Sequence, residues 1–67
     1  MRREITVQPH GPVLVELRTF DEGDGEVWLA SVDEAQREQW SVTVATGDSP
    51  DDALHALAVA LSRFGKA

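Results

Sequence analysis

SPDDALHALAVALSRFGK, residues 49–66, has the N-terminal cap, the apolar periodicity and the C-terminal glycine of one amphipathic helix, and this helix is the best-defined element of the sequence. Ser49 is a suitable N-cap, Pro50 fits the first helical position, and Asp52 lies three residues after the cap. Gly65 is suited to end the helix. Apolar side chains recur every three or four residues and form one stripe: Leu54, Leu57, Ala58, Leu61 and Phe64. We therefore expect a C-terminal helix that buries this stripe, including Phe64.

Two stretches before the helix read as paired β-strands. In VLVELRT, residues 13–19, apolar and charged side chains alternate, which is typical of a strand with one buried face. EVWLASV, residues 26–32, is apolar on both faces. Between them, FDEGDG at residues 20–25 has the glycines and acidic residues of a turn. We expect an antiparallel hairpin here.

A third strand is expected over residues 40–45, WSVTVA, after a polar connection at residues 33–39 with room for one helical turn. Three of its side chains are expected to point inward: Trp40, Val42 and Val44. Residues 4–7 have the pattern of an additional edge strand. The sequence thus predicts a single domain over residues 1–67, of the α+β class, in the order (β)βββα. Its three- or four-stranded antiparallel sheet carries the C-terminal helix on one face.

Length and charge exclude several classes of protein. Sixty-seven residues suffice for one small core and are too few for a deep substrate cleft beside it. With twelve acidic against six basic residues, the net charge of −6 argues against direct nucleic-acid binding by phosphate neutralisation. The chain has no cysteine, which excludes disulfides, zinc–thiolate sites and thiol nucleophiles. Neither a signal-peptide pattern nor an apolar run of membrane-spanning length occurs, so we expect a cytoplasmic protein without membrane contact.

Catalytic and metal-binding chemistry is weakly represented. The serines and the two histidines, His10 and His55, show no spacing that brings a nucleophile, a base and an orienting acid together. Asp51 and His55 share one face of the helix, but two ligands alone do not hold zinc. We therefore expect no enzyme, no metal and no cofactor. A small hydrolytic or metal-dependent enzyme is the third of three functional hypotheses, after the two given below.

The helix start also resembles a known family. GDSPDDAL, residues 47–54, resembles the Gly-Asp-Thr-x-Glu-Glu-Ala-like stretch of HicB-like antitoxins, and Asp24-Gly25 resembles the turn of their hairpin. The resemblance covers residues 13–64 at the level of pattern, and it implies a strand–strand–strand–helix fold and a toxin-neutralising role. Two features depart from the family. VDEAQREQW, residues 32–40, lacks the expected proline, and these residues include no C-terminal DNA-binding segment.

The predicted topology gathers carboxylates at one end of the sheet. Alternate connections of an antiparallel meander lie at the same end, so the 20–25 turn and the 46–49 connection come together. Seven carboxylates are expected there: Asp21, Glu22, Asp24, Glu26, Asp48, Asp51 and Asp52. We predict that this end neutralises a basic, nucleic-acid-processing protein, as small acidic antitoxins and phage anti-CRISPR inhibitors do. Six residues are predicted to make the contact: Asp21, Glu22, Asp24, Asp48, Asp51 and Asp52.

A self-associating structural module is the alternative function. Small domains are often stabilised by oligomerisation, so a homodimer is expected. Strand 26–32 is apolar on both faces, whereas one helix covers only one face of a sheet. We expect two copies to pair through the uncovered face or an edge strand, with Leu14, Trp28 and Val32 in the contact.

Overall fold

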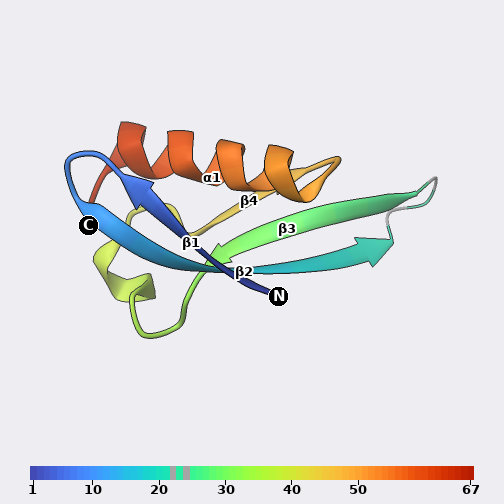
Figure 1. The fold of residues 1–67 in the computed structure, drawn as a ribbon, viewed down its shortest axis with the longest axis horizontal. Helices are drawn as coiled ribbons and strands as arrows, with labels where there is room; N and C mark the ends of the chain where they lie inside the picture. Colours follow the sequence, from blue (N-terminus) through green and yellow to red (C-terminus); the bar gives the residue numbers. More distant parts are fainter. Residues whose placement is uncertain (22, 24) are drawn as a thin grey trace.

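The structure is a computed structural model that describes residues 1–21, 23 and 25–67. Four strands form one antiparallel sheet in the order β1-β2-β3-β4, and helix α1 lies across one face of it (Figure 1). The elements are β1 (Arg2–Val7), β2 (Gly11–Asp21), β3 (Glu26–Val32), the 3-10 turn η1 (Arg37–Gln39), β4 (Val44–Gly47) and α1 (Pro50–Phe64). The predicted α+β class, antiparallel sheet and C-terminal helix are confirmed, and the additional edge strand is β1.

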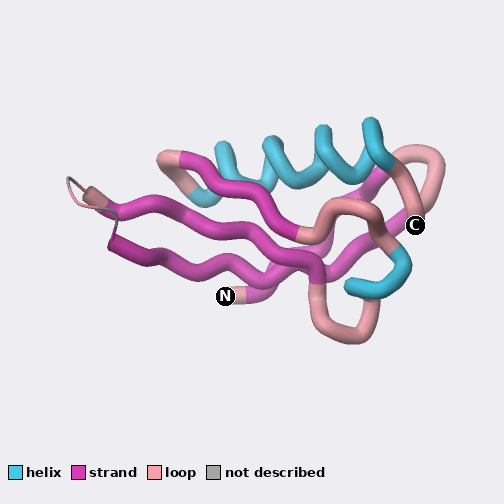
Figure 2. The backbone as a smooth tube through the Cα atoms, turned by 180° about the vertical axis from the view of Figure 1, so that it is seen from behind, coloured by secondary structure: helices cyan, strands magenta, loops and turns pink. Residues whose placement is uncertain are grey.

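The core lies between the sheet and α1. The register pairs Val15 with Val32 and Leu17 with Ala30, so alternate residues of β2 and β3 face the helix. Ten buried residues make up this core: Val7, Val13, Val15, Leu17, Ala30, Val32, Trp40, Ala53, Leu57 and Leu61. In the part of the chain that the structure describes, the opposite face of the sheet has no covering layer (Figure 2).

The ends of α1 are where the sequence predicts them. Ser49 Oγ accepts a hydrogen bond from the Asp52 backbone N–H at 3.1 Å, and Pro50 is the first helical residue. Gly65 ends the helix with a φ of 69°, a left-handed conformation that favours glycine. Its N–H donates to the Leu61 carbonyl. Capping by local side chains and backbone therefore defines both ends of α1.

The last strand starts later than the predicted residues 40–45. Pairing with β3 begins where the Val32 N–H donates to the Thr43 carbonyl at 2.8 Å, which places Val44 opposite Ser31. Because Ser31 lies on the face away from α1, Val44 points outward and is 52% exposed. The predicted inward orientation of Val44 is wrong.

Trp40 is buried, as predicted, but by the C-terminal tail rather than by strand pairing. Trp40 and Lys66 form an isolated antiparallel bridge, and the Lys66 ammonium lies 5.6 Å from the centroid of the Trp40 ring. His10 packs edge-on against the same ring, with 5.1 Å between the centroids. The tail and the β1–β2 turn therefore close this end of the core around Trp40.

The buried stripe of α1 also differs from the prediction. Ala53, Leu57 and Leu61 are fully buried at a spacing of four residues, whereas Phe64 is 61% exposed. Trp40, which is 5% exposed, fills the core beside the C-terminal tail. The prediction that Phe64 belongs to the core is wrong.

The β2–β3 hairpin extends beyond the rest of the sheet. β1 pairs with β2 only as far as Glu16, and β4 pairs with β3 only from Trp28 onward. Residues 20–21 and 26–27 consequently form a two-stranded ribbon that projects at one end of the molecule (Figures 1 and 2). The molecule measures 36 × 21 × 17 Å, and the hairpin lies at one end of its long axis.

Candidate functional site

The two acidic segments of the chain meet at the hairpin end of the molecule. Trp28, near the start of β3, pairs with Gly47, the last residue of β4. The β4–α1 connection and the first turn of α1 therefore lie at the same end as the β2–β3 hairpin (Figure 1). This arrangement is the one that the meander topology predicted.

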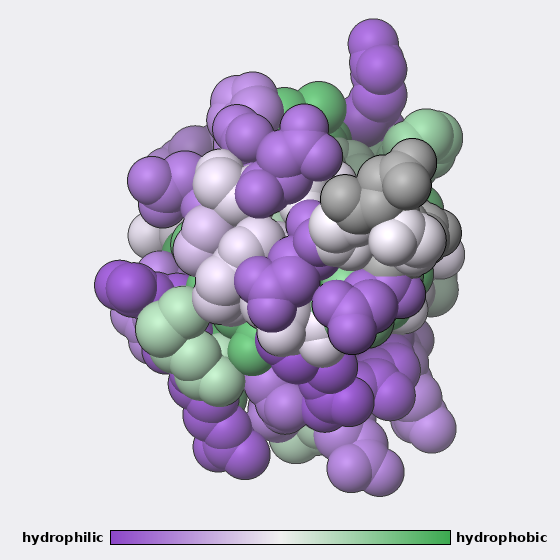
Figure 3. Space-filling view, turned by 90° about the vertical axis from the view of Figure 1, so that its right-hand side faces the viewer, coloured by the Kyte–Doolittle hydropathy of each residue, from purple (hydrophilic) through white to green (hydrophobic). Residues whose placement is uncertain are grey.

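Five described carboxylates form what we call the acidic end, and all five are exposed: Asp21, Glu26, Asp48, Asp51 and Asp52. Glu22 and Asp24, which were also predicted to contribute, lie outside the described residues. Residues 19–36 and 38–62 contain no lysine or arginine, so both segments bring carboxylates without basic neighbours in sequence. Figure 3 views the molecule from this end, where hydrophilic residues cover most of the visible face.

The acidic end is not neutralised by ion pairs within the described chain. The one ion pair there joins Arg18 to Glu16, with 2.6 Å between Nη2 and Oε1. Asp51 and Asp52 lie in the first turn of α1, where negative charge interacts favourably with the helix dipole. Two of the five carboxylates therefore also stabilise the helix. All five remain exposed and accessible to a partner.

An apolar pair on the ribbon was missed by the sequence interpretation. Phe20 is 39% exposed, lies opposite Val27, and shares with it the face away from α1. The sequence interpretation ended the strand at Thr19 and assigned Phe20 to the turn. The signal that could have found the pair is the alternation itself, because the outward-facing sequence Glu16, Arg18 continues to Phe20.

The predicted self-association surface does not exist as one face. Val32 lies opposite Val15 and Trp28 opposite Thr19, so both face α1, and Val32 is fully buried. Leu14 is the neighbour of Val15 in β2 and points to the other face. The placement of Leu14, Trp28 and Val32 in one exposed patch is therefore wrong. The homodimer itself stays a prediction.

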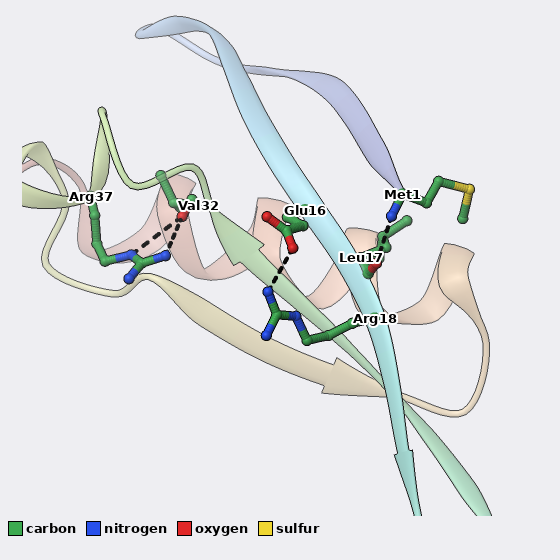
Figure 4. A network of polar contacts seen from close by, with 6 residues as sticks. All are labelled: Met1, Glu16, Leu17, Arg18, Val32 and Arg37. Atoms are coloured by element: carbon green, nitrogen blue, oxygen red, sulfur yellow. Dashed lines mark hydrogen bonds and ion pairs between the residues drawn. The ribbon is translucent and has the colours of Figure 1, made fainter.

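The open face of the sheet is polar rather than apolar. A shallow groove of about 510 Å³ crosses it, and its charged lining is balanced: Arg2, Arg18, Arg37, Glu16, Asp33 and Glu34. Arg37 donates two hydrogen bonds to the Val32 carbonyl, at 3.4 and 3.3 Å (Figure 4). Arg18 and Glu16 form an ion pair on the same face, so three basic and three acidic groups leave this groove without an excess of either charge.

The Arg18 side chain also changes the acidity of Glu16. Its hydrogen bond and its positive charge hold the pKa of Glu16 below the ordinary value of 4.5, with smaller contributions from Arg2 and the N-terminal amine. Figure 4 shows the two side chains turned toward one another across the face of β2. Glu16 therefore stays ionised to a lower pH than an isolated glutamate.

A second groove lies between the edge strand β1 and helix α1. It has a volume of about 550 Å³ and a wide opening. Eight residues line this edge groove: Thr6, Val7, Gln8, His55, Ala58, Val59, Ser62 and Arg63. The sequence interpretation placed Thr6 and Val7 in an edge strand and Ala58 in the apolar stripe of the helix, and it predicted no binding site among these eight residues.

Comparisons with known proteins found no match to this chain. The sequence matches no family model, no curated protein and no solved structure. The resemblance to HicB-like antitoxins therefore stays a prediction. Among the residues that the structure describes, no three His, Asp or Glu side chains are grouped to hold a metal ion. The described helices include none that is both long and apolar enough to cross a membrane.

Proposed function

We propose that this protein is a non-enzymatic binding protein whose acidic end occupies a basic surface on a protein partner. The observation that supports the proposal is the meeting of Asp21 and Glu26 with Asp48, Asp51 and Asp52 at one end of the molecule. None of these carboxylates forms an ion pair within the described chain. Their charge is therefore available to a partner.

In this proposal, the negative charge increases the association rate and the apolar contact decreases the dissociation rate. A concentrated negative end accelerates association with a basic surface, because long-range attraction steers the two proteins together. Phe20 and Val27 lie on the same ribbon as Asp21 and Glu26 and supply apolar area within the charged surroundings. Interfaces commonly place such an anchor inside a polar rim, and the anchor mainly slows dissociation.

The partner class follows from the charge pattern. Basic surfaces that accept a row of negative groups are typical of proteins that bind the phosphates of nucleic acids. The protein would compete with nucleic acid for such a surface, as an antitoxin or a phage-encoded anti-CRISPR-type inhibitor does. The pattern of residues 47–54 favours the antitoxin version. The identity of neighbouring genes, toxin or phage, separates the two versions.

The test is affinity capture from an extract of the source cells, with two charge-matched variants. D21K/D51K reverses two carboxylates of the acidic end, and E34K/E38K reverses two exposed carboxylates outside it. We expect D21K/D51K alone to lose the captured protein, and we expect excess duplex DNA to release that protein from the wild type. Equal loss with both variants, or capture that DNA does not compete, would contradict the proposal.

A further inference from the structure

The outer edge of β1 presents backbone groups in a definite order. Met1 and Leu17 exchange two hydrogen bonds, from the Leu17 N–H to the Met1 carbonyl at 2.6 Å and from the N-terminal amine to the Leu17 carbonyl at 3.1 Å. Hydrogen-bonded and non-hydrogen-bonded pairs alternate along an antiparallel ladder. The register therefore directs the backbone groups of Arg3, Ile5 and Val7 toward β2.

The remaining residues of β1 point their N–H and C=O groups away from the sheet. These are Arg2, Glu4 and Thr6. Thr6 lies opposite Pro12, which has no N–H to donate, in agreement with a non-hydrogen-bonded pair at this position. In the described chain nothing pairs with this edge, because β1 is the terminal strand of the sheet. Three residues thus offer unused donors and acceptors to an added strand.

The edge groove lies beside one of these three residues, Thr6. Thr6 and Val7 of β1 form one side of it, and α1 forms the other with Ala58, Val59 and Arg63 among its residues. Val59 is 45% exposed, so part of its apolar surface is open to the groove. A strand added to β1 would place alternate side chains on the helix side of the sheet, opposite Ile5 and Val7.

We propose that β1 and the edge groove bind an extended acidic segment of another protein by antiparallel strand addition. Backbone hydrogen bonds to Arg2, Glu4 and Thr6 hold the segment, and apolar side chains opposite Ile5 and Val7 enter the groove. This surface is separate from the acidic end, and its test does not depend on the proposed function.

Charge selects the acidic segment. The basic side chains along this surface, Arg2, Arg3 and Arg63, are three of the six in a chain of net charge −6. In antiparallel addition, acidic residues of the segment opposite Arg2 and Arg3 stabilise the strand pair, whereas an acidic residue opposite Glu4 would destabilise it. The segment that fits best therefore alternates valine and threonine and ends in two glutamates, Val-Thr-Val-Thr-Glu-Glu.

A second copy of this chain fits the edge less well. The symmetric register that uses all three free residues pairs Arg2 with Thr6 of the copy and places Glu4 directly against Glu4 of the copy. Like charges directly opposite one another destabilise a strand pair. A foreign acidic segment meets no such repulsion in the register described above.

Hydrogen exchange of single amides tests the proposal. In the unbound protein we expect the amides of Arg3, Ile5 and Val7 to exchange slowly and those of Arg2, Glu4 and Thr6 to exchange fast. Saturation with acetyl-Val-Thr-Val-Thr-Glu-Glu-amide should slow the second set. Fast exchange of all six amides without the peptide, or unchanged exchange with it, would overturn the proposal. Protection that rises with protein concentration alone would assign the edge to a second copy and overturn it as well.

Two altered peptides and two protein variants separate the contributions of backbone hydrogen bonds, charge and the apolar groove to binding. N-methylation of both threonines removes two of the three peptide N–H donors that face β1 and should abolish binding. Replacement of both glutamates by lysine should weaken binding by about three- to tenfold, the range expected for exposed ion pairs. Equal affinity of the lysine peptide would refute the acidic specificity. Val59→Glu should weaken binding, whereas Val44→Glu, at a similarly exposed valine of β4, should not.

Discussion

Gly47, the last residue of β4, lies directly against the backbone of Ala53 in the first turn of α1. A Cβ atom at Gly47 would lie 2.5 Å from the Ala53 nitrogen and 2.7 Å from the Asp52 carbonyl carbon. These atoms belong to backbone that Ser49 holds in place through its hydrogen bond to the Asp52 N–H. The close approach packs the end of the sheet against the start of the helix, and both lie at the acidic end.

Gly47→Ala should destabilise the protein because the added methyl group meets backbone that cannot move aside. We expect a loss of about 1–3 kcal/mol, the usual cost of an overpacked position. Chemical denaturation followed by circular dichroism measures it. The matched control is Gly25→Ala, where an added Cβ meets nothing within 4 Å. If both variants were equally stable, the close approach would have no energetic consequence.

The stripe of α1 can be tested by truncating two large side chains. Leu57 is fully buried and Leu57→Ala should cost about 2–5 kcal/mol, because it removes apolar contacts and leaves a cavity. Phe64 is 61% exposed, so Phe64→Ala should change the free energy of unfolding by less than about 0.5 kcal/mol. The measurement is the denaturant midpoint of each variant. A large effect at Phe64 would restore it to the core and contradict the structure.

The Glu16–Arg18 pair predicts a dependence on pH. The folded-state pKa of Glu16 lies below 4.5, so ionised Glu16 contributes stability that is present above this value and is lost as the pH falls through the folded-state pKa. Arg18→Gln should move the pKa of Glu16 back toward 4.5, because it removes the hydrogen bond and the nearby charge. A carboxyl titration followed by NMR measures this pKa in both proteins. Salt should reduce the difference, since the pair is exposed. An unchanged pKa in Arg18→Gln would show that the contact does not persist in solution.

Phe20 should govern how long the captured partner remains bound. Phe20→Ala removes the apolar anchor and leaves every carboxylate of the acidic end in place, so the dissociation rate should rise by about tenfold or more. The association rate should fall instead in D21K/D51K, and it should fall in the wild type as salt is raised. Surface plasmon resonance with the captured partner separates the two rates. Val44→Ala, on the same sheet face outside the ribbon, serves as the control. A dissociation rate that Phe20→Ala leaves unchanged would limit the contact to the charges.

The parts of the fold that local chemistry controls could be predicted from the sequence. Ser49 and Pro50 define the start of α1 and Gly65 its end, because each acts on backbone groups within a few residues of itself. The meeting of the two acidic segments could also be predicted, since alternate connections in an antiparallel meander share an end. The faces on which Leu14, Trp28 and Val32 lie could not, because they depend on the pairing of β2 with β3, and a shift of one residue moves a side chain to the other face.

The α+β class, the limits of the helix and the excess of negative charge follow from the amino-acid sequence alone, because they depend on neighbouring residues and on composition. The register of the sheet, the outward orientation of Val44, the contact of Trp40 with Lys66 and the exposure of Phe64 follow from tertiary packing. Tertiary pairing also determines which backbone groups of β1 face β2 and which face away from the sheet. The physical reason is that a strand takes its orientation from its hydrogen-bonding partner, and that partner lies far away along the chain.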